Sequence, residues 1–369
     1  MKVLFIGCQN IIKTMTGGEQ ESQKNYKLLN ALGEQYDIYA IIFSNDTIKL
    51  TNVSVFSKNK TIMDKTISVL SGRRIYRLRD ENKVLQKVKE IDPNVIFLDT
   101  TVIGGLIERI NAKIEKKIKV VTFMHNVEVN YVRNQFKYHS KLFGLTINAT
   151  YNNEKKALDN SDKIIVINQR DERELKKVYN KSADLVLPVS FADTFQSDRL
   201  NRSKGDKKLL FVGSDFPPNY HGIKRFVEEV MCKLPEYELT IVGRGFENRR
   251  EELSRDNVEV VGSVDDLSDY YYNYSSVVMP IFYGDGMKVK TAEAMMYGMN
   301  ILATDEALEG YDVDDIEGIK RCNTVEAFVE DIRKLEKNGV FNNDVRNYFL
   351  NNHEMYNQLD EFRSLIESD

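Results

Sequence analysis

Residues 284–293 read GDGMKVKTAE and contain two lysines, the second of which lies at helical spacing from an acid. Lys288 and Lys290 open a stretch whose apolar pattern predicts a helix, although cations are mildly unfavourable beside the positive N-terminal end of a helix dipole. The N–H groups at such an end already form an anion-binding site. A bound diphosphate would explain two ammonium groups there. The alternative is that both ammonium groups simply point into water.

Glu293 lies three residues after Lys290 and therefore on the same face of the expected helix. Its neighbours are alanines and methionines, which are a poor setting for a solvated acid. A carboxylate at this place can accept hydrogen bonds from both hydroxyls of a ribose. One helix would then hold a diphosphate at its end and a sugar ring one turn further in. The alternative for Glu293 is an ion pair with Lys290.

Strands and helices must position these residues, and the sequence shows their alternation twice. Short apolar runs rich in β-branched residues are typical of parallel strands that are covered on both faces. In the first half these runs are VLFIG (3–7), IYAIIF (38–43), VIFLD (95–99), KVVTFM (119–124) and KIIVIN (163–168), with a helix expected over 19–32. In the second half they are KLLFVG (208–213), LTIVG (239–243), VEVVG (258–262), SVVMP (276–280) and NILAT (300–304). Residues 44–94 are expected to mix short strands with one or two helices.

This pattern predicts an α/β protein with two doubly wound, Rossmann-like domains over residues 1–200 and 201–369, since the polar segment 188–207 resembles a linker. Ligands in such folds bind at the carboxyl ends of the strands, so we expect the site in a central cleft that the two domains face. No apolar run approaches the roughly 18 residues of a membrane-spanning helix. The three cysteines are far apart and lack metal-ligand spacing, which favours a cytoplasmic protein without disulfides or zinc.

Charge is distributed unevenly along the chain. Residues 1–200 contain 32 Lys and Arg against 23 Asp and Glu, a balance of +9, whereas residues 201–369 contain 20 against 33, a balance of −13. A basic first half indicates a surface that binds an anionic partner. The alternative is that the charge of solvated surface residues varies along the chain without a functional reason. The segments RRIYRLR (73–79) and KIEKKIK (113–119) suggest peripheral contact with an anionic membrane face.

The spacing D-x7-E from Asp285 to Glu293, followed by A-M-x-x-G-x-x-I-L-A-T, resembles the donor-site motif of retaining glycosyltransferases of the GT-B fold. The most similar group is glycosyltransferase family four, the glycogen-synthase-like group, which usually has E-x7-E. The resemblance covers nearly the whole chain and is strongest over 208–310. Other segments that resemble the family are FVGSDFPPNYHGIKRFVEEV, LTIVGRG, VVGSVDDLSDYYYNYSSVVMP, TGGEQ (16–20) and FMHNVE (123–128).

The resemblance implies roles for particular residues. Glu293 would bind the ribose of a nucleotide sugar, while Asp285 and Lys290 would lie near the transferred sugar and the leaving diphosphate. His125, after a strand, would contact the donor sugar near the reacting centre, and Glu128 would orient His125 or touch the acceptor. The other implied donor-binding residues are Gly17, Gly18, Gly213, Gly284, Gly286, Met287, Lys288, Val289 and Val264. Each of these assignments has an alternative. Gly17 and Gly18 could form an ordinary turn, His125 could simply pack in a loop, and Glu128 could be an acid at the start of a helix.

Two departures from the family pattern bear on these roles. Asp285 replaces the usual glutamate and is one methylene shorter. Many family members carry an Arg and a Lys just after the first strand of the second domain, where this chain has Ser214 and His221. Lys288 and Lys290 are therefore the better candidates to hold the diphosphate.

The resemblance implies a retaining, metal-independent hexosyltransferase that moves a sugar from a UDP- or GDP-linked donor to a hydroxyl of a glycan, lipid-linked or protein acceptor. Surface polysaccharide or glycoconjugate assembly is the expected process, without a cofactor and without nucleic acid as a partner. We also expect the last helix to pack back toward the first domain. A nucleotide-sugar epimerase and a non-catalytic GT-B partner of a transferase remain alternatives. A nicotinamide dehydrogenase is disfavoured, because no G-x-G-x-x-G follows the first strand.

Overall fold

A computed structural model describes residues 1–12, 16–70, 75–135, 144–200, 207–284, 286–335 and 341–368. The chain divides into two compact units, of which the first comprises Met1–Pro188 and Gln358–Asp369 and the second comprises Val189–Asn357. The boundary thus falls earlier than the expected residue 200. Residues just beyond Pro188 pack on the second unit, where the backbone N–H of Gln196 donates to the Tyr272 hydroxyl at 2.7 Å.

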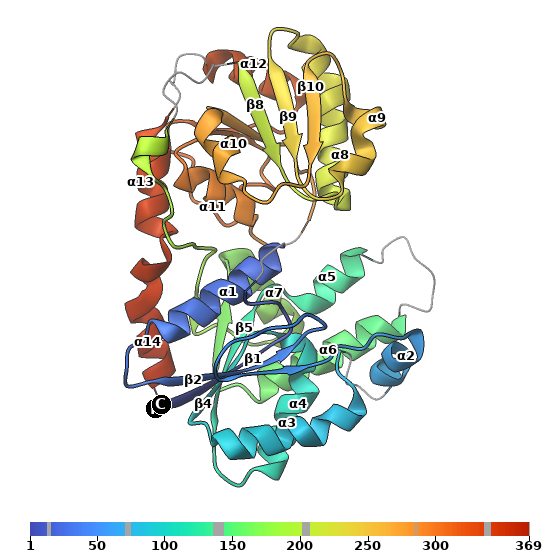
Figure 1. Ribbon diagram of the computed structural model, residues 1–369, viewed down its shortest axis with the longest axis vertical. Coiled ribbons are helices and arrows are strands. Elements are labelled where there is room, and N and C mark those ends of the chain that lie inside the picture. The colour runs from blue at the N-terminus through green and yellow to red at the C-terminus, as the bar shows by residue number, and fades with distance from the viewer. Residues whose placement is uncertain are drawn as a thin grey trace. The chain divides into compact units, whose positions relative to one another are not determined.

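The first unit is built on a parallel sheet (Figure 1). The described strands of this sheet run in the order β3-β2-β1-β4-β5-β6-β7. The strands are β1 (Lys2–Gly7), β2 (Asp37–Phe43), β3 (Val53–Phe56), β4 (Val95–Leu98), β5 (Lys119–Met124), β6 (Lys163–Val166) and β7 (Leu185–Val186). The helices are α1 (Gly17–Asn30), α2 (Ile62–Leu70), α3 (Leu78–Ile91), α4 (Gly104–Lys113), α5 (Glu128–Gln135), α6 (Gly144–Asp159), α7 (Gln169–Tyr179) and α14 (Leu359–Glu367). The strand order reverses between β1 and β4, which creates a switch point at their carboxyl ends.

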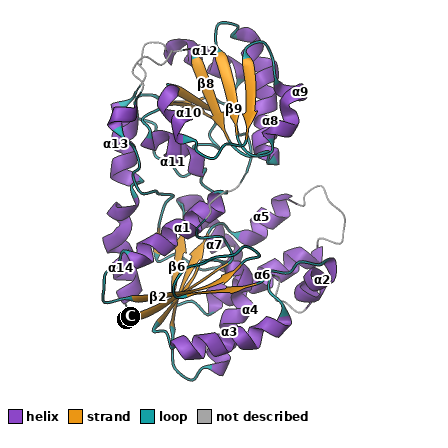
Figure 2. Cartoon of the chain, in the orientation of Figure 1, coloured by secondary structure: helices purple, strands orange, loops and turns teal. Residues whose placement is uncertain are grey.

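The second unit repeats this plan with a parallel sheet in the order β10-β9-β8-β11-β12-β13. Its strands are β8 (Lys208–Val212), β9 (Glu238–Val242), β10 (Val258–Gly262), β11 (Ser276–Met279), β12 (Asn300–Ala303) and β13 (Ile319–Arg321). Its helices are α8 (Pro217–Arg225), α9 (Arg250–Leu253), α10 (Ser268–Asn273), α11 (Val289–Met296), α12 (Val325–Leu335) and α13 (Asn343–Asn352). Figure 2 shows helices flanking both sheets, which is why the central strands are apolar on both faces. The switch point here lies between β8 and β11.

Helix α14 ends the chain and packs on the first unit. The buried ring of Phe362 lies 5.6 Å from the ring of Phe97 in β4. Lys119, at the start of β5, donates through Nζ to the backbone carbonyls of Leu365 at 2.8 Å and Ile366 at 3.2 Å. The lysine therefore binds carbonyls in the last turn of this helix, where a cation is favourable beside the negative end of the helix dipole.

A close contact between α8 and the chain after β11 leads to a first prediction. A Cβ added to Gly222 would lie 1.8 Å from the backbone oxygen of Pro280, so Gly222→Ala must push α8 away. We expect this substitution to lower the free energy of unfolding by about 1–3 kcal/mol, measured by urea denaturation. Gly144→Ala is the control, because a Cβ at Gly144 meets nothing within 4 Å. Equal effects of the two substitutions would contradict the close contact.

Candidate functional site

Lys290 lies at the switch point of the second sheet, where the carboxyl ends of β8 and β11 meet the start of α11. Its Nζ donates to Asn219 Oδ1 at 2.7 Å and lies 5.0 Å from the centre of the Phe211 ring. The same nitrogen is 3.0 Å from the position that a Cβ on Gly213 would occupy. The absence of a side chain at Gly213 therefore makes room for the ammonium group beside the end of β8.

The environment of Lys290 disfavours its own charge. Burial lowers its pKa from the usual 10.5 to about 7, and the positive charge of Lys288 contributes to the shift. Asn219 is neutral, and within the described ranges no carboxylate lies within ion-pair distance of Lys290. A poorly solvated ammonium without a counter-ion is suited to binding an anionic ligand.

Lys288 differs from Lys290 because it has an acid partner. Its Nζ lies 2.6 Å from Glu306 Oε1, and the side chains of Lys288 and Glu306 are only 13% and 18% exposed. The ammonium also donates to the backbone oxygen of Gly286 at 2.9 Å. Lys288 therefore ties the loop before α11 to the segment after β12, and its charge is already balanced.

The glycine loop before α11 has the backbone conformation for which glycine is needed. Gly284 has φ +153° and Gly286 has φ +67°. A Cβ on Gly284 would lie 3.5 Å from both the Lys288 ammonium and Glu306 Oε1, so the loop closes around this ion pair. Met287 is buried, and Val289, the first residue of α11, is partly buried. Asp285 lies outside the described residues.

Glu293 is held by a stack of aromatic residues. The Tyr271 hydroxyl donates to Glu293 Oε2 at 3.0 Å, and the Tyr271 ring stacks on Tyr297 with centroids 4.7 Å apart. Burial raises the pKa of Glu293 to about 7, which the hydrogen bond from Tyr271 opposes and the charge of Asp266 reinforces. Among the residues that the structure describes, Glu293 forms no ion pair with Lys290. Its carboxylate is therefore oriented by a phenol and keeps acceptor capacity for a ligand.

The loop after β10 lies near this carboxylate. Val264 is partly buried there, and Asp266 accepts hydrogen bonds from the backbone N–H of Ser268 at 2.8 Å and its hydroxyl at 2.7 Å. These bonds lower the pKa of Asp266, which therefore carries the charge that raises the pKa of Glu293.

Several residues at this site escaped sequence reasoning. Asn219 follows two prolines that start α8, Tyr271 belongs to a run of three tyrosines, and Glu306 follows the end of β12. Ser214 contributes its backbone oxygen, which accepts from Asn219 Nδ2 at 3.0 Å. The His221 side chain is hydrogen-bonded to Tyr283 and not to Lys290, and its Nδ1 lies 2.6 Å from the Tyr283 hydroxyl. Asn219, Tyr271 and Glu306 lie in α8, in α10 and after β12, so no short spacing in the sequence links them to α11.

Asn219 gives a second prediction. Asn219→Asp would place a carboxylate beside Lys290, where the amide oxygen now lies 2.7 Å from Nζ. We expect this charge to raise the pKa of Lys290 and to repel a diphosphate, so that UDP binds at least about tenfold more weakly in calorimetry. Uridine affinity should change little, and Asn219→Ala should fall between the wild type and Asn219→Asp. Unchanged UDP affinity in Asn219→Asp would place the diphosphate elsewhere.

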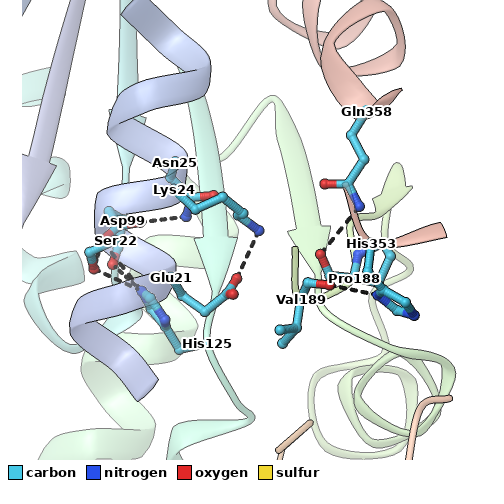
Figure 3. A network of polar contacts seen from close by, with 10 residues as sticks. All are labelled: Glu21, Ser22, Lys24, Asn25, Asp99, His125, Pro188, Val189, His353 and Gln358. Atoms are coloured by element: carbon cyan, nitrogen blue, oxygen red, sulfur yellow. Dashed lines mark hydrogen bonds and ion pairs between the residues drawn. The ribbon is translucent and has the colours of Figure 1, made fainter. Parts of the chain in front are cut away.

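His125 follows β5 in the first unit and belongs to a buried polar group (Figure 3). Its Nε2 lies 3.1 Å from the backbone oxygen of Asp99, 3.3 Å from Asp99 Oδ2 and 3.5 Å from Ser22 Oγ. Asp99 follows β4, while Ser22 belongs to α1. Burial alone would lower the pKa of His125, but the charge and hydrogen bond of Asp99 outweigh it and raise this pKa. His125 is therefore a partnered side chain at a strand end.

The other predicted residues of the first unit lie at helix starts. Gly17 and Gly18 begin α1, and the Thr16 side chain accepts from the backbone N–H of Glu19 to cap this helix. Glu128 begins α5, and its own backbone N–H donates to Glu154 Oε1 at 2.8 Å. The charge of Glu128 contributes to the raised pKa of His125.

The basic segments use part of their charge within the protein. Lys116 pairs with Asp92 at 2.9 Å and Lys117 with Asp162 at 3.9 Å, and Lys119 binds the end of α14. The segment 73–79 lies partly outside the described residues. No helix in the described ranges is long and apolar enough to cross a membrane. The same ranges contain no group of His, Cys, Asp or Glu side chains placed to hold a metal ion.

The two parallel-sheet units define a GT-B architecture, which confirms the predicted fold class. Residues 206–338, which include Lys290 and Glu293, match the family model described as Glycosyl transferases group 1. A curated relative is an uncharacterized 44.6 kDa protein in the cps region of Klebsiella pneumoniae, which is 25% identical over 248 residues. The match spans 62% of this chain and 62% of that relative's length.

Solved structures share the whole fold. Sucrose-phosphate synthase from Thermosynechococcus elongatus matches with a TM-score of 0.75 at 16% identity, with 100% of both chains covered. HepE from Anabaena, solved in complex with UDP and glucose, matches with a TM-score of 0.69 at 12% identity, again over 100% of both chains. The family match and the shared GT-B fold together support a glycosyltransferase.

Proposed function

We propose that the protein is a retaining glycosyltransferase that moves a sugar from a nucleotide sugar to an acceptor hydroxyl without a metal ion. The observation that carries this proposal is Lys290, an ammonium with neutral partners at the switch point of the second sheet. Glu293 follows one turn later on the same helix. This order suits a ligand in which a diphosphate is joined to a ribose, as in a nucleotide sugar.

The proposed chemistry follows from where charge develops. As the glycosidic bond breaks, the nucleoside diphosphate gains negative charge, which the Lys290 ammonium and the N–H groups at the start of α11 would stabilise. The sugar passes through an oxocarbenium-like state. Glu293 would anchor the ribose, and His125 and Asp285 would lie near the transferred sugar. Retention of configuration is carried over from the family resemblance of the D-x7-E segment.

The donor is tested by a thermal-shift screen with UDP, GDP and their sugar conjugates. A ligand at 100 times its Kd stabilises the folded state by about 2.7 kcal/mol, which is an easily measured shift. Product analysis then separates the readings: a glycosylated acceptor supports the transferase, an altered nucleotide sugar an epimerase, and binding without turnover a non-catalytic partner. HepE in complex with UDP and glucose makes UDP the first probe.

For the acceptor we propose a glycan or glycoconjugate precursor of surface polysaccharide assembly, lipid-linked or protein-bound, met by the basic first half of the chain. The +9 balance of residues 1–200 and the relative in the cps region support this proposal. The same positive charge of residues 1–200 would attach the protein to an anionic membrane surface. Sedimentation with anionic and neutral vesicles at low and high salt tests it, and equal sedimentation with both would indicate a soluble acceptor.

A further inference from the structure

Asp99 is a fully buried carboxylate whose hydrogen-bond donors are mostly neutral. Its side chain is 0% exposed. Asn25 Nδ2 donates to Oδ1 at 2.7 Å, and the Ser22 hydroxyl donates to Oδ2 (Figure 3). Among the described residues, the other polar side chain beside this carboxylate is His125, whose Nε2 lies 3.3 Å from Oδ2. All four residues belong to the first unit, so the group is complete within one unit.

The geometry decides where one proton of His125 must sit. Nε2 faces two oxygens of Asp99 that can only accept. The Ser22 hydroxyl already donates its hydrogen to Asp99, so it offers none to the ring. Nε2 must therefore carry a proton and donate. The remaining question is whether Nδ1 is protonated as well.

The charge balance of the group answers this question. A buried carboxylate without a cationic partner is costly, and neutral donors compensate it only in part. Lys24, on the same helix as Ser22, is paired at 2.7 Å with Glu21, and both side chains are at most 3% exposed. A cation that pairs directly with Asp99 is thus supplied by His125 when both ring nitrogens carry protons. Glu21 from α1 and Glu128 from α5 also face the ring with negative charge and favour the same state.

We propose that Asp99 is a positioning residue that keeps His125 as an imidazolium, with Nε2–H bound to Asp99 and Nδ1–H presented to an oxygen of the anionic substrate. The second part rests on the proposed glycosyltransferase function, whereas the first part concerns the protein alone. Nδ1 has no hydrogen-bond partner among the described residues, and the side chain is 12% exposed. A neutral ring would present a lone pair at Nδ1 and repel such an oxygen. Asp99 therefore decides whether His125 donates to the substrate.

The charge state is measured directly by NMR titration of the histidine ring protons in the full chain. The sequence contains four histidines, and His125→Gln identifies the signal of His125 by its loss. We expect a midpoint above the ordinary value near 6.5 in the wild type. In Asp99→Asn the midpoint should fall by about 1 pH unit or more, since the charge is removed and a side chain of the same shape is kept. Glu108→Gln, which removes an exposed carboxylate of the first unit, should leave it unchanged.

Two outcomes would overturn the proposal. A wild-type midpoint at or below 6.5 shows that the ring is not held as an imidazolium, and this result does not depend on the Asp99→Asn variant. A high midpoint that persists in Asp99→Asn assigns the proton to another group. Neither result depends on catalysis, so each is distinguishable from a failure of the glycosyltransferase assignment, which UDP binding and product analysis test separately.

The link to substrate has its own readout in the pH dependence of kcat. If the imidazolium donates to the substrate, activity in Asp99→Asn should fall at a lower pH than in the wild type, in step with the shifted NMR midpoint. Glu108→Gln, which leaves this group intact, should retain the wild-type profile. Profiles of Asp99→Asn and wild type that coincide would show that the charge of His125 is not used in the reaction.

Discussion

Replacing Lys290 by Met is expected to reduce turnover by about 10²–10³-fold while the fold is retained, because the leaving diphosphate of the proposed reaction would lose the cation that we assign to it. The loss should be visible in binding as well. UDP affinity, measured by calorimetry, should fall strongly, whereas uridine affinity should change little, since uridine lacks the phosphates. Equal losses for uridine and UDP would contradict the placement of Lys290 at the diphosphate.

Lys288→Met is the matched comparison, because the two lysines are two residues apart but have different partners. The ammonium of Lys288 is paired with Glu306 at 2.6 Å, so its removal frees a carboxylate and loosens the glycine loop. We expect a smaller loss of UDP affinity than in Lys290→Met, together with a lower melting temperature. A larger effect of Lys288→Met on UDP affinity would show that the ion pair opens to bind the phosphates.

The stability of the protein without ligand should respond to pH in a defined direction. The pKa of Lys290 is lowered in the folded state from 10.5 to about 7, so the unfolded chain binds the proton more tightly between these values. The free energy of unfolding therefore rises with pH across this window, and Lys290→Met removes the rise. The free energy of unfolding of Lys290→Met should exceed that of the wild type by the largest amount at and below pH 7.

The sheets were predictable because their central strands are buried on both faces. The run KVVTFM forms β5 with the predicted bounds, and VLFIG lies within β1. Strands β7 and β13 were not predicted, and β3 was expected only as one of the short strands of residues 44–94; each of the three lies at the edge of its sheet. Edge strands need neighbours on one side only and can be short, as β7 (Leu185–Val186) is. Pairing in register, rather than an apolar run, defines them.

The candidate site was predictable only where its residues share one helix. Lys290 and Glu293 are related by helical spacing, which is visible in the chain itself. The partner of Lys290 is Asn219, 71 residues away, and Asn25 reaches Asp99 over 74 residues. Such pairs depend on the order of strands in the sheet, which spacing does not encode. Lys288 and Lys290 likewise have different partners, and this difference follows from tertiary contacts alone.

The pKa values of Lys290 and Glu293 are shifted in opposite directions, and these shifts predict how donor binding depends on pH. Burial brings the pKa of both groups to about 7 from opposite directions. Below this value Glu293 is protonated and would accept ribose hydroxyls poorly, and above it Lys290 loses the charge that we propose holds the diphosphate. Affinity for an intact nucleotide sugar should therefore be highest near neutrality. The affinity for uridine, which has no phosphates, should show only the increase with pH that ionisation of Glu293 causes.

Glu293→Gln is expected to weaken UDP binding by about 1.5–3 kcal/mol, or roughly ten- to a hundredfold, because the ribose loses a charge-assisted acceptor. Unlike Lys290→Met, it should weaken uridine binding by a similar factor, since both ligands carry the ribose. Calorimetry with the two ligands at pH 8, where the wild-type carboxylate is ionised, measures both effects. Glu259→Gln, an exposed acid of β10 in the same unit, is the control and should bind as the wild type does.

The pH dependence gives the decisive test of Glu293. Its pKa is raised in the folded state from 4.5 to about 7, so folding favours the protonated form and the free energy of unfolding falls as pH rises between these values. Ligand binding requires the opposite form, and uridine affinity should therefore increase from pH 6 to pH 8. Glu293→Gln should abolish both trends. Tyr271→Phe removes the hydrogen bond that favours the ionised carboxylate, so it should move the rise in uridine affinity to higher pH. A uridine affinity that is independent of pH in the wild type would remove Glu293 from the ribose site.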